Sequence, residues 1–284
     1  MILVTSIFNN SERWIVDILR CFDDLIKITP DIEILFIEGN SIDNTYNILQ
    51  NWVKQRSKTC RLVQVDISSV IEGINIFNKP TCFTHKHNDS VDILFSDGKI
   101  DSLREERYRL VKLSSKIGYG RFEKLAMLRN ISTRIGLDGN NYDYIMSIDS
   151  DVYFNGDLIV KLMQSMKNNN CDLVAPMIYI KEYREYDNTY FYDTFAFRIG
   201  GQSFIPSPPY ILNVDNKWTV VEVDSVGTCY LMKGELGGVA YTGENDSEQV
   251  EFCNKLREKN KKIIVDRNIE VLHVNFEKYG MEWH

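Results

Sequence analysis

The chain has 284 residues, of which 44% are hydrophobic and 12% aromatic, and its 33 basic and 40 acidic side chains give a net charge of −7. This length and apolar content argue for a packed core and against intrinsic disorder. The acidic balance argues against a broad nucleic-acid surface and leaves only local phosphate sites. Since no signal peptide or transmembrane segment is recognisable, we expect a soluble, cytoplasmic protein.

The cysteines are spaced widely along the chain and form no C-x-x-C pair. Most of them fall within apolar stretches, where a small free thiol packs well. This pattern predicts free thiols in a reducing compartment rather than a disulfide framework. The six residues are Cys21, Cys60, Cys82, Cys171, Cys229 and Cys253.

Short apolar strands alternate with amphipathic helices along the whole chain, which predicts an α/β layered structure. In the first quarter, strands are expected at 2–8, 31–39 and 61–66, with helices after the first two. Ser11 is expected to be the N-cap of the first helix. Residues 67–120 are expected to mix loops with a charged helix near 102–113.

The second half continues the same rhythm. Its predicted elements are a helix at 121–137, a strand ending at Ile148, a helix at 156–168, strands at 172–180 and 226–234, a helix at 246–259 and a closing strand that contains His273.

Two acids follow the strand that ends at Ile148, in the sequence "SIDSDV". Asp149 and Asp151 share one side if the backbone stays extended, and they stand where the strand gives way to a loop. Ligands of open α/β sheets bind beyond the carboxyl ends of the strands, and carboxylates suit Mn²⁺ or Mg²⁺. The alternative is a solvated strand end whose acids cap the next helix.

A second polar group follows the second strand, in "EGNSIDNT", beside the polar end of the first strand, "TSIFNN". Ser41 or Asp43 is also a reasonable helix N-cap, so a structural role stays open for this group. Two polar clusters at one edge of a sheet nevertheless favour a binding site over either cluster alone.

Basic and acidic residues on later elements are candidates for the same site. Arg129 lies near the apolar face of its helix and is suited to neutralising a diphosphate. His273 interrupts an apolar strand, where it is either a satisfied core residue or a Mn²⁺ or Zn²⁺ ligand. Asp246 forms a reasonable capping box with Gln249, and a carboxylate at a helix N-terminus is also suited to act as a base.

The order of these motifs resembles that of nucleotide-sugar glycosyltransferases with the GT-A fold, a Rossmann-like domain with a mixed, mainly parallel sheet flanked by helices. The most specific matches are "LRN", "SIDSDV" and "YDTFAFR". The chain looks most like the fungal capsule-associated α-1,3-mannosyltransferase family. This resemblance implies a single domain over 1–284, with a nucleotide-binding half at 1–150 and an acceptor-binding half at 151–284.

The resemblance also implies roles for individual residues. The donor nucleotide would be held by Thr5, Ser6, Asn9 and Glu38, with Arg129 near the pyrophosphate and Asp149 at the ribose or the metal. The metal ligands would be Asp149, Asp151 and His273. Mn²⁺ or Mg²⁺ would act as a Lewis acid on the departing nucleoside diphosphate.

Two features depart from the family pattern. Inverting members carry an E-D pair before the last helix, and here the pair is Glu248 and Gln249. Since Gln cannot accept a proton, either Asp246 or Glu248 is the base or the anomeric configuration is retained. The fungal relatives also carry a membrane anchor, which is not apparent in this sequence.

We therefore expect a metal-dependent glycosyltransferase that moves a sugar from GDP-mannose or a UDP-sugar to a hydroxyl of a glycan acceptor. One alternative is a sugar nucleotidyltransferase, although "SIFNNSERW" lacks the Gly-rich basic loop of that class. Another is a non-catalytic protein that binds nucleotides or glycans. The oligomeric state and the donor sugar do not follow from the sequence.

Overall fold

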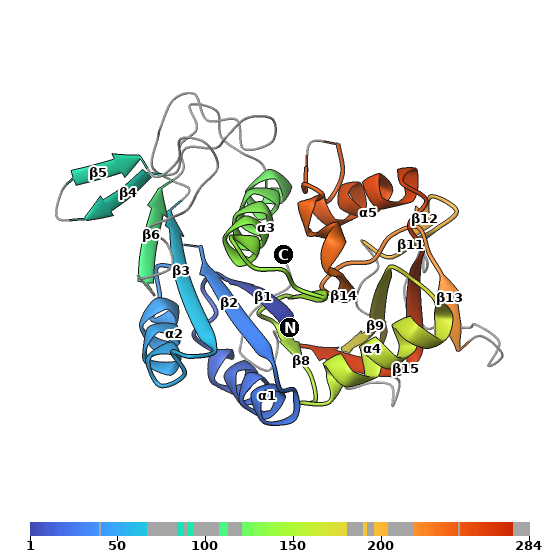
Figure 1. Ribbon diagram of the computed structural model, residues 1–284, viewed down its shortest axis with the longest axis horizontal. Helices are drawn as coiled ribbons and strands as arrows, with labels where there is room; N and C mark the ends of the chain where they lie inside the picture. The colour runs from blue at the N-terminus through green and yellow to red at the C-terminus, as the bar shows by residue number, and fades with distance from the viewer. Residues whose placement is uncertain are drawn as a thin grey trace.

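The computed structural model describes residues 1–39, 41–66, 84–87, 90–93, 108–112, 121–180, 190–191, 196–203, 219–243 and 245–274. These residues form one large mixed sheet with helices on both faces (Figure 1). Its main strand order is β13-β15-β9-β14-β7-β1-β2-β3-β6-β4-β5. The predicted α/β architecture with a helix-flanked sheet is confirmed.

The N-terminal part of the sheet is built mainly from parallel strands with nearly continuous apolar sequences. Such runs are expected where helices cover both faces of a parallel sheet. The parallel strands are β1 (Ile2–Phe8), β2 (Ile32–Glu38), β3 (Cys60–Asp66), β6 (Tyr108–Lys112) and β7 (Tyr144–Ile148). The hairpin of β4 (Thr84–His87) and β5 (Ser90–Ile93) extends this edge in antiparallel orientation.

The C-terminal part mixes strand directions. β14 (Cys229–Lys233) pairs antiparallel with β7 and with β9 (Leu173–Ile180), and β15 (Ile263–His273) pairs parallel with β9. The short strand β8 (Val152–Tyr153) pairs antiparallel with the end of β15. Smaller elements are β10 (Tyr190–Phe191), β11 (Arg198–Ile199), β12 (Gln202–Ser203), β13 (Val220–Glu222) and the 3₁₀ helix η1 (Gly234–Gly238).

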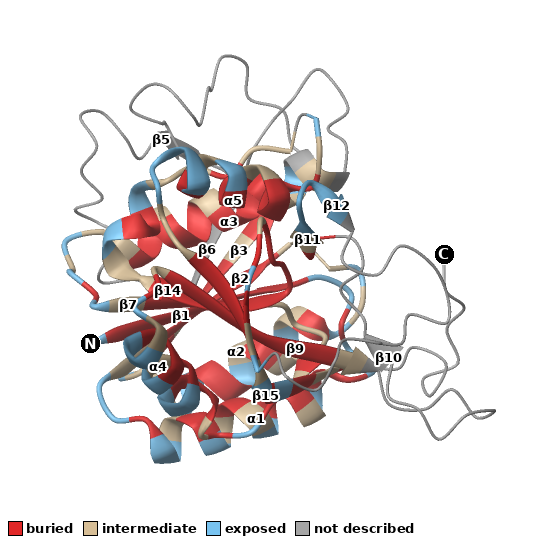
Figure 2. Ribbon diagram, turned by 90° about the vertical axis from the view of Figure 1, so that its right-hand side faces the viewer, coloured by how far each residue is buried: buried red, intermediate tan, exposed pale blue. Residues whose placement is uncertain are grey.

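Helices cover the two faces of the sheet as separate groups. The helices α1 (Ile15–Ile28), α2 (Thr45–Lys54) and α4 (Leu158–Asn169) lie on one face, and α3 (Arg121–Leu137) and α5 (Glu248–Glu258) lie on the other (Figure 1). Figure 2 shows that the strands between them are buried, whereas exposed positions lie on the outer sides of the helices.

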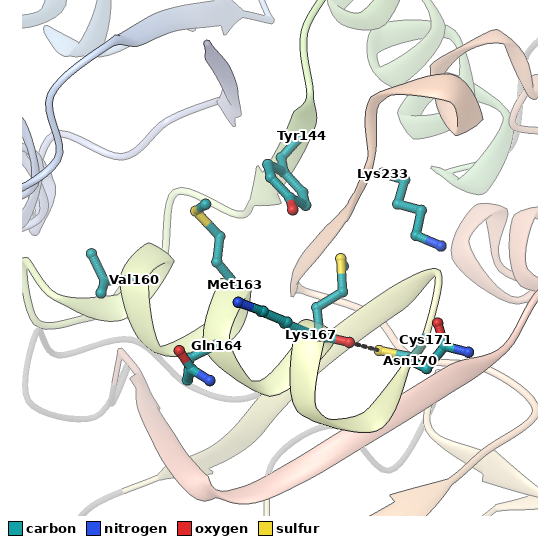
Figure 3. Close-up of a pocket in the computed structure, with 9 residues that line it drawn as sticks. Tyr144, Val160, Met163, Gln164, Lys167, Asn170, Cys171 and Lys233 are labelled. Carbon is teal, nitrogen blue, oxygen red and sulfur yellow. Dashed lines mark hydrogen bonds between the residues drawn. The ribbon is translucent and has the colours of Figure 1, made fainter.

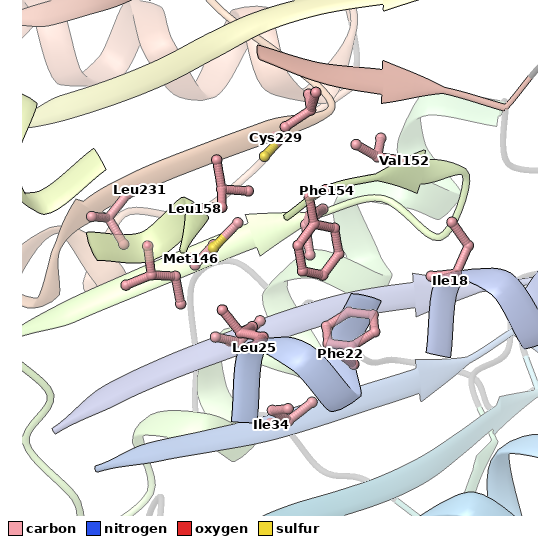
Figure 4. Packing of buried hydrophobic residues seen from close by; sticks show 14 of the residues in the cluster. Ile18, Phe22, Leu25, Ile34, Met146, Val152, Phe154, Leu158, Cys229 and Leu231 are labelled. Carbon is pink, nitrogen blue, oxygen red and sulfur yellow. The ribbon is translucent and has the colours of Figure 1, made fainter. Parts of the chain in front are cut away.

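Alternating side chains of each strand feed two apolar cores. In β2, Ile34 and Phe36 pack under α1 and α2, while Leu35 and Ile37 pack under α3. Figure 4 shows the first core, where Phe22 of α1 makes an edge-on contact with Phe154 at 5.2 Å between ring centroids. The two cores fix the sheet from both sides and thereby the position of its carboxyl edge.

Three local predictions are wrong. Residues 108–112 form β6 rather than part of a helix, because pairing with β3 outweighs the helix propensity of that charged segment. Ser11 is not a side-chain cap of α1, since its hydroxyl lies 3.3 Å from the hydroxyl of Ser150. The cap of α5 is Ser247 rather than Asp246, because the Ser247 hydroxyl accepts the amide of Val250.

The described cysteines are free thiols, as predicted, and Cys82 lies outside the described residues. Within the part of the chain that the structure describes, no helix is both long enough and apolar enough to cross a membrane. The division into halves at residue 150 stays a prediction.

Candidate functional site

The carboxyl ends of β1, β2 and β7 lie at one edge of the sheet. Their parallel register sets Phe8 beside Glu38 and Thr5 beside Ser147, so the loops that follow all begin at this edge. Figure 1 shows α3 and α5 above the sheet, on the face opposite to α1, α2 and α4. The two polar clusters predicted from sequence therefore occur at a common edge, where open α/β sheets bind ligands.

The backbone turns at Ser150, so Asp149 and Asp151 contact different partners. The loop between β1 and α1 holds this turn in place, because the Ser150 carbonyl accepts the indole N–H of Trp14 at 3.0 Å. The condition under which the two acids would share one side, an extended backbone, is not met, and they face different partners. The turn sends one carboxylate toward α3 and the other toward β15.

Asp151 meets His273 across a sequence separation of 122 residues. The pairing of β8 with β15 places Val152 beside His273, and the amide of Val274 donates to the Asp151 carbonyl at 2.7 Å. The His273 Nε2 lies 3.1 Å from the Asp151 Oδ2, and its Nδ1 lies 2.8 Å from the Val274 carbonyl. Since a carbonyl only accepts, Nδ1 carries a proton and Nε2 faces the carboxylate.

The Asp151–His273 pair has the character of a metal site. Burial lowers the pKa of His273, but Asp151, the Val274 carbonyl and Asp149 together outweigh burial and raise the pKa above its ordinary value. A ligating histidine commonly donates its second ring N–H to a backbone carbonyl, as His273 does to Val274. An imidazole nitrogen and a carboxylate oxygen together suit Mn²⁺, so these two residues fit the ion that the sequence predicted.

Asp149 does not join the other two predicted metal ligands. Within the described ranges, no group of three or more His, Cys, Asp or Glu side chains is arranged to hold a metal ion. The reason is local: Asp149 Oδ1 accepts a hydrogen bond from the guanidinium of Arg129 at 2.8 Å. Of the three predicted metal ligands, Asp151 and His273 are the two in contact with each other.

Arg129 is buried and contacts the side chains of Glu248, Ser147 and Asp149. We call these four residues the charged centre. The Nε of Arg129 donates to Glu248 at 3.0 Å, one terminal nitrogen donates to Ser147 at 3.1 Å, and the other donates to Asp149. All three guanidinium nitrogens are thus engaged by the protein. Arg129 lies at the predicted edge, but its contacts are to protein carboxylates and a hydroxyl.

The charged centre also sets the protonation of Asp149. Burial raises the pKa of this carboxyl, Asp151 raises it further, and Arg129 opposes both effects. The result is a pKa of about 6. Asp149 is therefore an acid whose charge depends directly on the cation beside it.

Each of the two predicted bases is paired with an arginine. Glu248 is 3% exposed and accepts from Arg129, whereas Asp246 is 27% exposed and accepts two hydrogen bonds from Arg198, at 2.6 and 2.8 Å. Asp246 also accepts the amide of Ser247 at 2.7 Å. Of the two acids, only Asp246 is open enough to meet a substrate.

The predicted nucleotide residues on β1 and β2 mainly bind their own loops. Glu38 is fully buried, and its two oxygens accept the Ser41 amide at 2.6 Å and the Gln64 side chain at 2.8 Å. Asn9 is exposed and donates to the Gly39 carbonyl at 2.8 Å. These contacts fix the loop after β2 against the loop after β1.

Thr5 and Ser6 complete this group within β1. Thr5 donates to the Met146 carbonyl at 3.3 Å and so ties β1 to β7. The Ser6 hydroxyl is buried and makes no hydrogen bond to any residue that the structure describes. Of the four predicted nucleotide residues, Asn9 is the one with an exposed side chain.

Sequence reasoning missed Arg198, Ser147 and Ser150 as parts of the site. Arg198 belongs to the quoted segment "YDTFAFR", in which an arginine closes an aromatic run, and this contrast was a usable signal. Ser147 gave none, because a serine inside an apolar strand is common. Asp246, the partner of Arg198, is 48 residues away along the chain, and Arg129, the partner of Ser147, is 18 residues away.

No protein-family model matches the sequence, and no curated protein matches it. Solved structures do resemble the fold. GalNAc-T7 with UDP, GalNAc and Mn²⁺ is 15% identical with a TM-score of 0.54, over 97% of this chain and 43% of that chain. TarS residues 1–349 from S. aureus in complex with UDP-GlcNAc is 13% identical with a TM-score of 0.52, over 100% of this chain and 59% of that chain.

These similarities show that the chain has the mixed α/β fold of GT-A glycosyltransferases. The chain spans less than two thirds of the length of these solved proteins. At such low identity the likeness concerns the fold alone, and the narrower fungal mannosyltransferase family is not confirmed.

Proposed function

We propose that this protein is a glycosyltransferase that moves a sugar from a nucleotide-sugar donor to a hydroxyl of a glycan acceptor, with Mn²⁺ or Mg²⁺ bound by Asp151 and His273. The observation that carries the proposal is the contact between these two residues at the carboxyl edge of β7. The GT-A fold supports it, since that edge is where this type of sheet binds its ligand.

The donor would lie along the edge from the β1–β2 loops to Asp151. Among the predicted nucleotide residues of these loops, the exposed side chain is that of Asn9, which carries no charge and suits a nucleoside rather than a phosphate. The diphosphate would lie toward Asp151 and His273. A metal bound there supplies charge stabilisation for the departing diphosphate.

Arg129 is proposed to act on the site through Asp149 rather than by touching the donor. Its guanidinium neutralises the carboxylate beside Asp151, which limits the negative charge that a diphosphate would meet. It also ties the D-x-D turn to the first turn of α5 through Glu248. Glu248 is then a structural partner, and Asp246 is the better candidate to orient or deprotonate the acceptor hydroxyl.

The test is a panel of UDP- and GDP-sugars assayed for Mn²⁺-dependent hydrolysis and transfer. Replacement of Asp151 by Asn is expected to reduce turnover at least 100-fold, on the order of one lost metal-charge interaction. It should also weaken Mn²⁺ binding measured by calorimetry. Asp24→Asn on α1 is the matched control, because Asp24 is exposed and pairs only with Lys27 among the described residues.

Two outcomes would count against the proposal. The first is that none of the donors binds or reacts in the presence of Mn²⁺. The second is that Asp151→Asn retains the activity of the Asp24→Asn control. A nucleotidyltransferase would be revealed in the same panel by formation of a nucleotide sugar from a nucleoside triphosphate and a sugar phosphate.

A further inference from the structure

A pocket of about 460 Å³ lies at the other end of the sheet from the site described above. Tyr144 begins β7 and Lys233 ends the antiparallel strand β14, so both mark the edge at which the parallel strands start. The helix α4 forms the facing wall (Figure 3). We call this space the α4 pocket; the proposed sugar transfer makes no use of it.

The α4 pocket has a mixed lining, in which five apolar or aromatic side chains stand beside Gln164, Asn170 and two lysines. Figure 3 shows Met163 reaching from α4 toward Tyr144, and Val160 lies one turn earlier on the same helix. Val160 is 50% exposed, which is unusual for a large aliphatic side chain in this structure. An apolar wall with flexible methionine side chains adapts readily to ligands of different shape.

Two lysines line the same space from different elements. Lys167 is exposed on α4 and makes no ion pair with any residue that the structure describes. Lys233 comes from β14, and its Nζ lies 2.9 Å from the Asp172 carboxylate. Lys261 lies 3.7 Å from the same carboxylate but pairs more closely with Glu235, at 2.8 Å. The two acids thus balance Lys233 and Lys261 and leave Lys167 without a carboxylate partner among the described residues. Positive charge therefore remains in excess at the pocket.

The Cys171 thiol in the wall adds no negative charge. Burial raises the pKa of the Cys171 thiol to about 11, and its Sγ lies 3.9 Å from the Met166 carbonyl. The thiol is thus neutral at physiological pH and contributes a soft apolar surface. An anion entering the pocket would meet ammonium groups without a competing thiolate.

We propose that the α4 pocket binds a small amphipathic anion. Its apolar body would pack against Tyr144 and Met163, and its carboxylate or phosphate group would pair with Lys167 and Lys233. The volume falls within the range of roughly 300–1,000 Å³ that small-molecule sites occupy. The site is separate from the sheet edge proposed for the sugar donor, and its binding is measured without a donor.

The experiment uses octanoate, octyl phosphate and octanol as probes on the full chain with ¹³C-labelled methionine methyl groups. Both anions are expected to shift the Met163 and Met166 signals saturably, with octanol at least tenfold weaker. Met163→Leu assigns the Met163 signal. A preference for octanoate indicates a fatty acid as the source, and a preference for octyl phosphate indicates a phosphorylated lipid.

The paired substitution Lys167→Gln with Lys233→Gln should weaken binding of both anions at least tenfold and leave octanol unchanged. Lys161→Gln is the control, since Lys161 lies on the same helix outside the pocket and pairs with Asp157. The proposal is overturned if octanol binds as tightly as the anions. It is also overturned if the paired variant keeps its affinity, or if neither methionine signal moves.

Discussion

On the β1–β2 side of the candidate site, polar side chains are bound to neighbouring loops by uncharged backbone and amide groups, whereas on the β7 side they are held by ion pairs. Glu38 accepts from Ser41 and Gln64, which are 3 and 26 residues away. Arg129 and Glu248 are separated by 119 residues, and three secondary structure elements meet at the charged centre.

This difference shows what stabilises the β1–β2 side and the β7 side of the candidate site. The β1–β2 side depends on uncharged backbone and side-chain amides, which the pairing of β1, β2 and β3 brings together. The charged centre depends on several buried charges that balance one another, and the loss of one leaves another uncompensated. The second region should therefore be the more sensitive to mutation and pH.

The largest expected effect is from Arg129→Met. It leaves Glu248 buried without its cation, which should reduce the free energy of unfolding by about 3–5 kcal/mol, as for other broken buried pairs. Urea denaturation measures this loss. The double variant with Glu248→Gln should recover part of it, and a loss of less than about 1 kcal/mol would show that the pair is not a major source of stability.

Glu38→Gln tests the other region. A glutamine presents an N–H group to one of the two donors that Glu38 now accepts, so one buried donor loses its acceptor. The expected destabilisation is about 1–3 kcal/mol, with Mn²⁺ affinity unchanged. Glu258→Gln, an exposed position on α5, is the control, and a changed Mn²⁺ affinity would contradict the separation of the two regions.

A pH effect is expected only from the charged side. In metal-free protein, burial lowers the pKa of His273, but Asp151, the Val274 carbonyl and Asp149 together raise it above its ordinary 6.5. A raised folded-state pKa stabilises the fold fully below pH 6.5, and this contribution is lost as the pH rises through the folded pKa. Urea midpoints between pH 6 and 8.5 should fall in the parent, and His273→Gln should flatten that fall.

The smallest change in stability is expected for Arg198→Gln. The pair with Asp246 is about one quarter exposed on each side, so its loss should cost about 0.2–1 kcal/mol. The variant should lose much of its transfer activity although it stays nearly as stable as the parent, because Asp246 loses the two hydrogen bonds that Arg198 donates to it. If Arg198→Lys restores activity fully, charge alone is sufficient and the fork geometry is not required.

Much of the fold was predictable because each strand and helix has its own periodicity. The strands at 2–8 and 172–180 differ from the observed ones by no more than one residue at either end. The site was predictable as a set of positions at one sheet edge, because parallel strands share a direction. The partners of Asp149 were not predictable, since the turn at Ser150 depends on Trp14.

The sequence by itself determined the α/β class, the strands that end in acids, and the group of residues from which a site is made. Those features follow from apolar periodicity and from residue chemistry, which are local. Only the tertiary structure decided that Asp151 meets His273 while Asp149 meets Arg129. Carboxylates pair with whichever cation the sheet and helices bring within a few ångströms, and packing sets that distance, across 122 residues for Asp151 and His273 and across 20 for Asp149 and Arg129.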